Sequence, residues 1–177
     1  MIAQFEDIKI VKFHSERGND LYDLIERNRN DLNDYFAGTT SKTKTLEDTL
    51  AYAVVIEERI QRKEYFPFLL IDKQTDELIG FIDVKNISWS IPKAELGYFI
   101  DIHSGGKGIT SKAVGLVIDY LIEKYQFKKL LCRVGSKNIG SIKVATKNGF
   151  ELEGTIRRDY KTTSGKLVDL NYYGRIF

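Results

Sequence analysis

The sequence predicts an α/β domain with a mixed, mostly antiparallel, twisted sheet of about seven strands, a parallel central pair and helices on both faces. Three observations predict this fold. Short runs rich in β-branched and aromatic residues are typical of strands. Longer segments repeat apolar residues at helical spacing. One helical segment lies between two strand-like runs, and this succession favours a right-handed parallel unit.

The composition fits one domain spanning residues 1–177. Apolar residues make up 42% of the chain, charged residues make up 29%, and only two prolines occur, so a disordered linker is not expected. The net charge of +2 comes without a long block of one sign, which argues against nucleic acid as a direct partner. The first residues lack a secretion signal, and no apolar run could span a membrane. We therefore expect a cytoplasmic protein.

The first half of the chain predicts one strand and two helices before the first hairpin. Residues 8–13 have a β-rich composition and form the expected first strand. A helix follows, on which Leu21, Leu24, Ile25 and Leu32 share one face, with Asn19 or Asp20 as its N-cap. Residues 38–41 are expected to break the helical pattern. A second, longer helix should open at Thr45 and run to about Lys63.

The second half predicts two hairpins around the parallel unit. Residues 66–72 and 78–84 flank a polar loop and form the first hairpin. Residues 96–102 and 129–134 are parallel strands joined by a helix over 109–125. A short helix follows Asn138 and ends near Gly149, a residue suited to the left-handed conformation after a helix. Residues 150–158 and 167–175 close the chain as the second hairpin.

A glycine-rich turn joins the strand at residues 96–102 to the helix at 109–125, and it predicts an anion site. Backbone N–H groups and the positive end of the helix dipole converge there. A Walker A loop is excluded, because Gly108 follows Gly106-Lys107 where Ser or Thr is needed. A dinucleotide fingerprint is poorly matched, because Ser111 replaces the third glycine. By itself, the turn leaves the bound anion open.

Four segments of the sequence, taken together, narrow the choice of the bound anion. They are Glu95-Leu-Gly-Tyr-Phe-Ile100, Gly106-Lys-Gly-Ile109, Asn138-Ile-Gly-Ser-Ile-Lys-Val-Ala-Thr-Lys-Asn-Gly-Phe150 and Glu153-Gly-Thr-Ile-Arg157. In order and spacing they resemble the GNAT superfamily of N-acetyltransferases. Glu26-Arg-Asn-Arg29, followed by Leu32 and Tyr35, resembles the first helix of the RimJ/RimL-like branch, which acetylates protein N-termini, including those of ribosomal proteins. The resemblance covers nearly the whole chain.

The resemblance implies acetyl-coenzyme A as cosubstrate, with no metal. The backbone around the end of the central strand would pair with the pantetheine arm, and the glycine-turn amides would hold the pyrophosphate. Asn138 would contact the coenzyme arm besides capping its helix, and Lys147 would reach the adenosine phosphates. The implied coenzyme-binding residues are Phe99, Ile100, Asp101, Ile102, Gly105, Gly106, Lys107, Gly108, Ile109, Thr110, Asn138, Ser141 and Lys147.

Acetyl transfer to an amine needs a neutral amine, a stabilised oxyanion and a proton for the departing thiolate. By resemblance, Ser141 supplies that proton, because Ala145 occupies the position where many relatives carry a tyrosine. An inward-facing Glu95 would have a raised pKa and accept the amine proton through water, with Asp83 and Asp101 as alternatives.

The acceptor should enter between the first two helices and the strand ends. Its predicted contacts are Asn28, Arg29, Tyr35 and Trp89. Cys132 is predicted to be a packing residue, and neither His14 nor His103 has a partner at metal-ligand spacing. Gly105 replaces the glutamine that commonly precedes the glycine pair, and Lys112 replaces a usual glutamate, so a looser turn is expected.

We therefore expect an N-acetyltransferase that acts by direct attack on the thioester. A protein N-terminal α-amino group is favoured as acceptor, since its pKa near about 8 makes it easier to deprotonate than a lysine side chain. Two alternatives remain open: a small amine such as a polyamine or an aminoglycoside, and a catalytically silent acyl-coenzyme A sensor. The sequence also leaves the oligomeric state open, a homodimer included.

Overall fold

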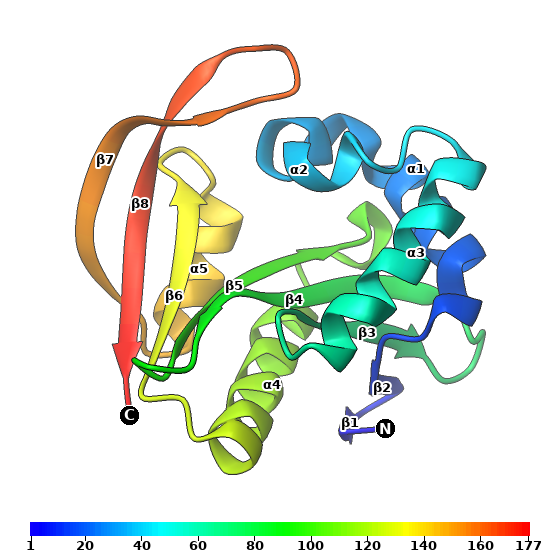
Figure 1. Ribbon diagram of the computed structural model, residues 1–177, viewed down its shortest axis with the longest axis horizontal. Helices are drawn as coiled ribbons and strands as arrows, with labels where there is room; N and C mark the ends of the chain where they lie inside the picture. The colour runs from blue at the N-terminus through cyan, green and yellow to red at the C-terminus, as the bar shows by residue number, and fades with distance from the viewer.

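The computed structural model describes residues 1–177 as an eight-stranded sheet with helices on both faces (Figure 1). The strands are β1 (Ala3–Phe5), β2 (Ile8–Lys12), β3 (Phe66–Asp72), β4 (Leu78–Ser88), β5 (Lys93–Ile100), β6 (Lys129–Gly135), β7 (Glu151–Lys161) and β8 (Leu167–Ile176). The α-helices are α1 (Gly18–Tyr35), α2 (Ala37–Thr40), α3 (Leu46–Gln61), α4 (Ile109–Tyr125) and α5 (Ile139–Lys147). Two 3₁₀ turns are η1 (Ser15–Arg17) and η2 (Ile102–Ser104).

The strand order is β1-β2-β3-β4-β5-β6-β8-β7, and only the β5–β6 pair is parallel. The predicted mixed sheet with a parallel central pair is therefore confirmed. It has eight strands because β1, at the edge of the sheet, pairs with β2 through three residues. Such a short segment has too little periodicity to be recognised from sequence.

Both faces of the sheet are buried, which explains the uninterrupted apolar run along β3. Phe68 and Leu70 face the core formed with α4, whereas Leu69 and Ile71 face the core formed with α1 and α3. Alternate residues of a strand point to opposite faces, so a strand covered on both sides is apolar throughout. None of the helices is both long enough and apolar enough to cross a bilayer.

The parallel pair opens into a fork that creates the space for a site. Lys93, Ala94 and Glu95 of β5 pair with residues 129–131 of β6, and beyond this point the two strands separate. Figure 1 shows β5 and β6 diverging from their lower ends, with α5 beside β6 and α4 below the sheet. Residues 96–100 of β5 therefore have a backbone edge without a neighbouring strand on the β6 side.

Several predicted boundaries need correction. The first helix begins at Gly18 without a side-chain cap, because Ser15–Arg17 already form a helical turn, so the predicted cap at Asn19 or Asp20 is wrong. The predicted break at residues 38–41 falls largely within the short helix α2. The strand predicted over 96–102 spans Lys93–Ile100, because Asp101 accepts the N–H of His103 and starts the turn η2.

Other local predictions hold. The side chain of Thr45 caps α3 by accepting the N–H of Asp48. Gly149 has a positive φ of 74° directly after α5, and the N–H of Phe150 returns to the carbonyl of Ala145. Local backbone chemistry fixes these features, so the sequence alone is sufficient to predict them.

Candidate active site

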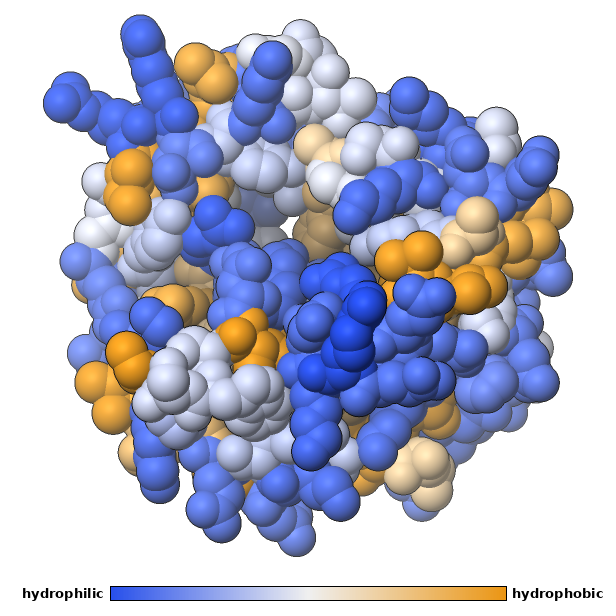
Figure 2. All heavy atoms as spheres, viewed as in Figure 1, coloured by the Kyte–Doolittle hydropathy of each residue, from blue (hydrophilic) through white to orange (hydrophobic).

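A cavity of about 530 Å³ lies in the fork of the sheet. Its walls come from α1, the end of β5, the glycine turn and the first turns of α5. Figure 2 shows the surface hollowed near the centre of this view, between the strands β6–β8 on one side and the helices α1–α3 on the other. We call this space the large cavity.

The glycine turn presents a row of free donors to the large cavity. Gly106 and Gly108 have positive φ values of 77° and 80°, a conformation that side chains rarely allow. The first backbone bond of the following helix runs from the N–H of Lys112 to the carbonyl of Gly108. The amides of residues 106–111 have no acceptor within the protein. Successive free N–H groups at the positive end of a 17-residue helix suit a phosphate or pyrophosphate.

Side chains of α1 hold the segment that leads into this turn. Asn28, predicted to contact the acceptor, is buried and accepts the N–H of Ile102 at 2.9 Å. Arg27 donates to the Asp101 carboxylate at 2.7 Å, and the other oxygen of that carboxylate accepts the N–H of His103 at 3.0 Å. Asp101 is therefore occupied in holding the turn. Asn28 also lines the large cavity.

The same contacts set the ionisation of Asp101. Burial alone would raise the pKa of its carboxyl, but the His103 amide and the Arg27 guanidinium outweigh burial and hold that pKa below its usual range. A folded-state pKa below the unfolded value adds stability above about pH 4, and this stability disappears as the pH falls through the folded-state pKa.

We expect Asp101→Asn to lower the free energy of unfolding at pH 7 by about 1–3 kcal/mol, the usual range for losing a charged hydrogen bond. The difference from the unmodified protein should shrink as the pH falls below about 4. Urea denaturation at pH 7, 4 and 3 measures it. Asp119→Asn is the matched control, because Asp119 is exposed and has no side-chain partner. A difference that stays constant with pH would contradict the role of charge.

The N-terminus of α5 forms the opposite wall of the large cavity. Asn138 accepts the N–H of Ser141 at 3.0 Å, as expected of an N-cap. Tyr98, reaching across from β5, donates its hydroxyl to the backbone carbonyl of Ser141 at 2.9 Å. The hydroxyl of Ser141 has no hydrogen bond within the protein and lines the cavity. Ser141 is thus held by its backbone while its hydroxyl remains available.

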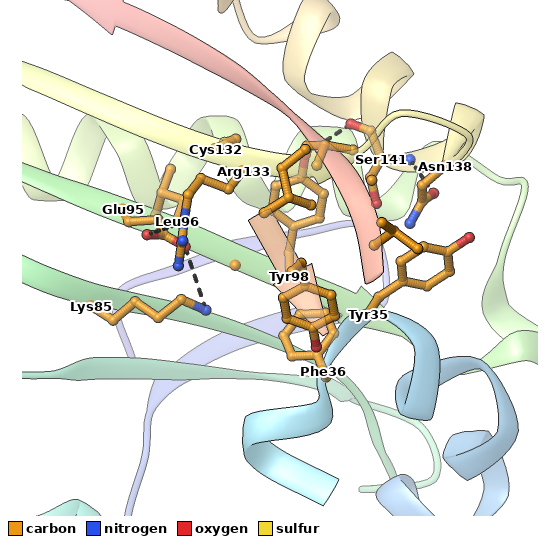
Figure 3. Close-up of a pocket in the computed structure, with 16 residues that line it drawn as sticks. Tyr35, Phe36, Lys85, Glu95, Leu96, Tyr98, Cys132, Arg133, Asn138 and Ser141 are labelled. Atoms are coloured by element: carbon orange, nitrogen blue, oxygen red, sulfur yellow. Dashed lines mark hydrogen bonds and ion pairs between the residues drawn. The ribbon is translucent and has the colours of Figure 1, made fainter. Parts of the chain in front are cut away.

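A second cavity of about 100 Å³ continues from the large one toward the other side of the sheet. We call it the small cavity. The two cavities share Tyr35, Phe36, Tyr98, Asn138 and Ser141. Figure 3 shows these side chains gathered at one side of the small cavity, with Lys85, Glu95 and Arg133 at the other. Ser141 therefore stands where the two cavities meet.

Four charged side chains cluster at the far side of the small cavity. Glu95 receives hydrogen bonds at its Oε2 from Arg133 and Asn86, both at 2.8 Å, and its Oε1 lies 4.0 Å from the Lys85 ammonium. Lys85 also contacts the buried Asp83 at 3.3 Å. Glu95 faces inward and is almost fully buried, and its partners Arg133, Asn86 and Lys85 were not anticipated from the sequence.

Lys85 and Arg133 keep their positive charges in this cluster. Burial lowers the pKa of Lys85, but the carboxylates of Asp83 and Glu95 outweigh it, so the pKa is raised overall. Burial likewise lowers the pKa of Arg133, but Glu95 together with Tyr172 outweighs it, so this pKa is also raised overall. The two positive and two negative charges of the cluster cancel; Lys85, Arg133 and Glu95 line the small cavity, and Asp83 lies behind Lys85.

Gly97 makes room for this cluster. It lies opposite Asp83 in the β4–β5 ladder, and a Cβ atom there would come within 2.2 Å of Asp83 Oδ1 and 2.8 Å of Lys85 Nζ. Any larger residue would displace the buried Asp83–Lys85 pair. A glycine in the middle of a strand often marks such a close approach.

Several other predicted site residues lie outside the two cavities. Trp89 stacks on Phe127 with ring centroids 5.4 Å apart and donates to the carbonyl of Lys63. Arg29 pairs with Glu26 and donates to the carbonyl of Thr43. Lys112, noted above only as an unusual residue after the glycine turn, pairs with Glu6. The linings also do not include Asp101, Ile102, Gly105 and Lys107.

The remaining predicted residues line one or both cavities. They are Asn28, Tyr35, Glu95, Phe99, Ile100, Gly106, Gly108, Ile109, Thr110, Asn138, Ser141 and Lys147. Cys132 lines the small cavity as a buried residue of β6, and burial raises the pKa of its thiol, so the thiol stays protonated. Sequence reasoning missed Lys143, which lies four residues before Lys147 on α5 and joins it at the large cavity. The spacing of four residues, which places two side chains on the same face of a helix, could have identified Lys143 from the sequence.

Comparison with known proteins shows which family shares this arrangement. The acetyltransferase (GNAT) domain family matches residues 10–151. Probable N-acetyltransferase YjcK of Bacillus subtilis is 34% identical over 106 residues, 59% of each chain. The ribosomal-protein-serine acetyltransferase of Escherichia coli is 31% identical over 117 residues, 66% of this chain and 64% of the relative. The alignments thus span about three-fifths of these relatives.

A likeness to solved structures extends over almost the whole chain. A ribosomal α-N-protein acetyltransferase, RimL, solved in complex with coenzyme A, superposes with a TM-score of 0.90. The match covers 99% of this chain and 97% of that protein at 21% sequence identity. At this identity the likeness shows a shared fold.

Proposed function

The chain belongs to the acetyltransferase (GNAT) domain family, and we propose that it transfers an acetyl group from acetyl-coenzyme A to a primary amine, with a protein N-terminal α-amino group as its preferred acceptor. The observation that carries the proposal is the meeting of the two cavities at Ser141. One cavity offers an anion site and the other a nearly neutral pocket for an amine. The reacting groups would meet at their junction.

The large cavity suits the coenzyme for reasons that lie in its own walls. The free amides of residues 106–111 would bind the pyrophosphate. The unpaired edge of β5 at Phe99 and Ile100 would hydrogen-bond the amide groups of the pantetheine arm. Lys143 and Lys147 have no ion-pair partners, and their charges would favour the remaining phosphate.

Two side chains at the junction would carry the proton transfers. The amine nitrogen attacks the thioester carbonyl carbon, forming a C–N bond, and the C–S bond then breaks. Ser141 would donate its hydroxyl proton to the departing thiolate, because its Oγ has no other partner, and it would regain a proton from the amine by way of Glu95 and water. Glu95 would take the proton released by the amine through a water at its Oε1, the oxygen without a hydrogen bond.

The charge of the small cavity supports an N-terminal acceptor over a polyamine. A polyamine carries several positive charges and would favour a pocket with excess negative charge. Here Lys85 and Arg133 balance Asp83 and Glu95. An N-terminal α-amino group also loses its proton more readily than a lysine side chain, so it needs less help from a base.

A substrate panel tests the proposal. It compares peptides with a free N-terminus, N-terminally blocked peptides with one lysine, spermidine and an aminoglycoside, and it measures released thiol together with product mass. We expect the free N-terminal peptides to give the highest kcat/KM. Faster turnover of spermidine or of the blocked peptides would overturn the proposed acceptor. If acetyl-coenzyme A raises the melting temperature and no amine is acetylated, the chain is a coenzyme-binding sensor.

A further inference from the structure

A third cavity of about 280 Å³ adjoins the small cavity. We call it the outer cavity. It shares Tyr35, Gly135 and Val168 with the small cavity, so the two spaces adjoin. Its walls are the end of α1, the loop after β6 and the beginning of β8. A chain that placed its first residue in the small cavity could leave through this space.

One wall of the outer cavity is an unpaired strand edge. The ladder between β6 and β8 ends at Gly135 and Leu170, and one more bond runs from the N–H of Ser136 to the carbonyl of Asp169. Leu167, the first residue of β8, lies before this ladder begins and pairs only with Lys161 of β7. The beginning of β8 therefore pairs with β7 on one side and has no β6 partner on the other.

The backbone of Leu167 faces the outer cavity. The Asp169 carbonyl points to the β6 side, because it accepts from Ser136. The Lys166 carbonyl points to the β7 side, because it accepts the N–H of Thr162 at 2.9 Å. Backbone groups alternate in direction along an antiparallel strand, so both observations direct the N–H and carbonyl of Leu167 toward the β6 side. Leu167 and Asp169 both line the outer cavity.

This edge is held at a fixed position relative to α1. The hydroxyl of Tyr160 on β7 accepts the N–H of Ala37 at 2.7 Å. The N–H of Thr163, at the tip of the β7–β8 hairpin, donates to the Asn33 carbonyl at 3.0 Å. These two contacts connect the hairpin to the segment carrying Tyr35, so the two walls of the outer cavity are linked by hydrogen bonds.

We propose that the outer cavity binds the second to fourth residues of the acceptor as an extended strand that adds to the edge of β8 at Leu167. The proposal rests on the proposed function and names its substrate class: a peptide rather than a free amine. Main-chain hydrogen bonds would supply the recognition, as in other cases of strand addition. The charged side chains on the walls carry both signs and favour no particular acceptor sequence. They are Asp34, Lys137, Lys166 and Asp169.

Peptide length and backbone chemistry test the acceptor side. A tetrapeptide amide should be acetylated with a kcat/KM about five- to tenfold above that of the dipeptide amide sharing its first two residues. N-methylation of the second or the third residue removes one backbone donor. Because donors alternate along a strand, we expect one of these two peptides to lose about five- to tenfold and the other to lose far less.

The corresponding test on the protein uses two substitutions at one position. Leu167→Pro removes the backbone N–H at the first residue of an exposed strand end, where proline is tolerated. It should lower kcat/KM for the tetrapeptide about five- to tenfold and affect the dipeptide amide, which has only one residue in the outer cavity, far less. Leu167→Ala keeps the N–H, so it should slow the tetrapeptide far less than Leu167→Pro does. Leu152→Ala, at an exposed position of β7 outside all three cavities, is the control that should leave both peptides unchanged.

The outcomes separate this proposal from the one on which it rests. Equal rates for dipeptide and tetrapeptide would overturn strand addition and leave N-terminal acetylation standing. The same would follow if Leu167→Pro slowed both peptides equally. If no peptide with a free N-terminus is acetylated, the proposed acceptor itself fails.

Discussion

Replacing Ser141 with alanine is expected to lower kcat by about 10²- to 10³-fold, the usual contribution of a positioned proton donor. The dissociation constant for coenzyme A should change less than about threefold. Asn138 accepts from the Ser141 amide and Tyr98 donates to the Ser141 carbonyl, so the backbone contacts that hold this position survive the substitution. Only the hydroxyl is removed.

The measurement is steady-state thiol release with a free N-terminal peptide, together with titration calorimetry for coenzyme A. Thr146→Ala is the matched control on the same helix, because the Thr146 hydroxyl bonds to the carbonyl of Ile142 within α5 and lies outside both cavities. It should retain full activity. An unchanged kcat in Ser141→Ala would remove the hydroxyl from the mechanism. A loss of coenzyme affinity matching the loss of kcat would make Ser141 a binding residue.

The features that could be predicted from sequence depend on contacts between residues close in the chain. The glycine turn, the Asn138 cap and the Thr45 cap each rest on backbone chemistry within a few residues. The parallel β5–β6 pair follows from the handedness of a strand, helix, strand unit. These elements place the free amides of the glycine turn and the first turn of α5 without knowledge of the tertiary structure.

The features that sequence reasoning missed depend on contacts between distant residues. Glu95 and Arg133 are 38 positions apart, and Tyr98 and Ser141 are 43 positions apart. Neither pair can be recognised as a pattern in the sequence. The Glu95–Arg133 pair depends on the register of β5 against β6, and the Tyr98–Ser141 pair depends on how α5 packs against β5. Trp89 was misplaced for the same reason, since its partner Phe127 comes from the segment before β6.

The motif at residues 26–35 of α1 shows a different limit of prediction from sequence. Three members of this segment, Asn28, Leu32 and Tyr35, line the large cavity, but the sequence does not show which way each member faces. Arg27 and Asn28 turn toward the segment before the glycine turn, whereas Arg29 pairs with Glu26 along the same helix. Successive residues of a helix point about 100° apart, so neighbouring members of one motif can serve different tasks.

Replacing Gly108 with valine is expected to weaken acetyl-coenzyme A binding at least about 30-fold, equivalent to about 2 kcal/mol. Gly108 has a φ of 80° directly before α4, where a β-branched side chain is strained by about 1–3 kcal/mol. The chain would relieve this strain by rotating the turn, and the free amides of residues 106–111 would then no longer converge. A Cβ at this position meets no other atom within 4 Å, so the loss would come from backbone conformation rather than from a clash.

Calorimetric titration and the rise in melting temperature with saturating coenzyme measure this effect. Gly154→Val is the control for added bulk, because Gly154 lies in β7, has an ordinary φ and open space around its α-carbon. Gly108→Asn separates strain from side-chain volume: asparagine tolerates the left-handed region far better than valine and should lose much less affinity. If asparagine and valine weakened binding equally, side-chain bulk would be the cause. Wild-type affinity in Gly108→Val would mean that the turn amides do not hold the coenzyme, and the anion site would have to lie elsewhere.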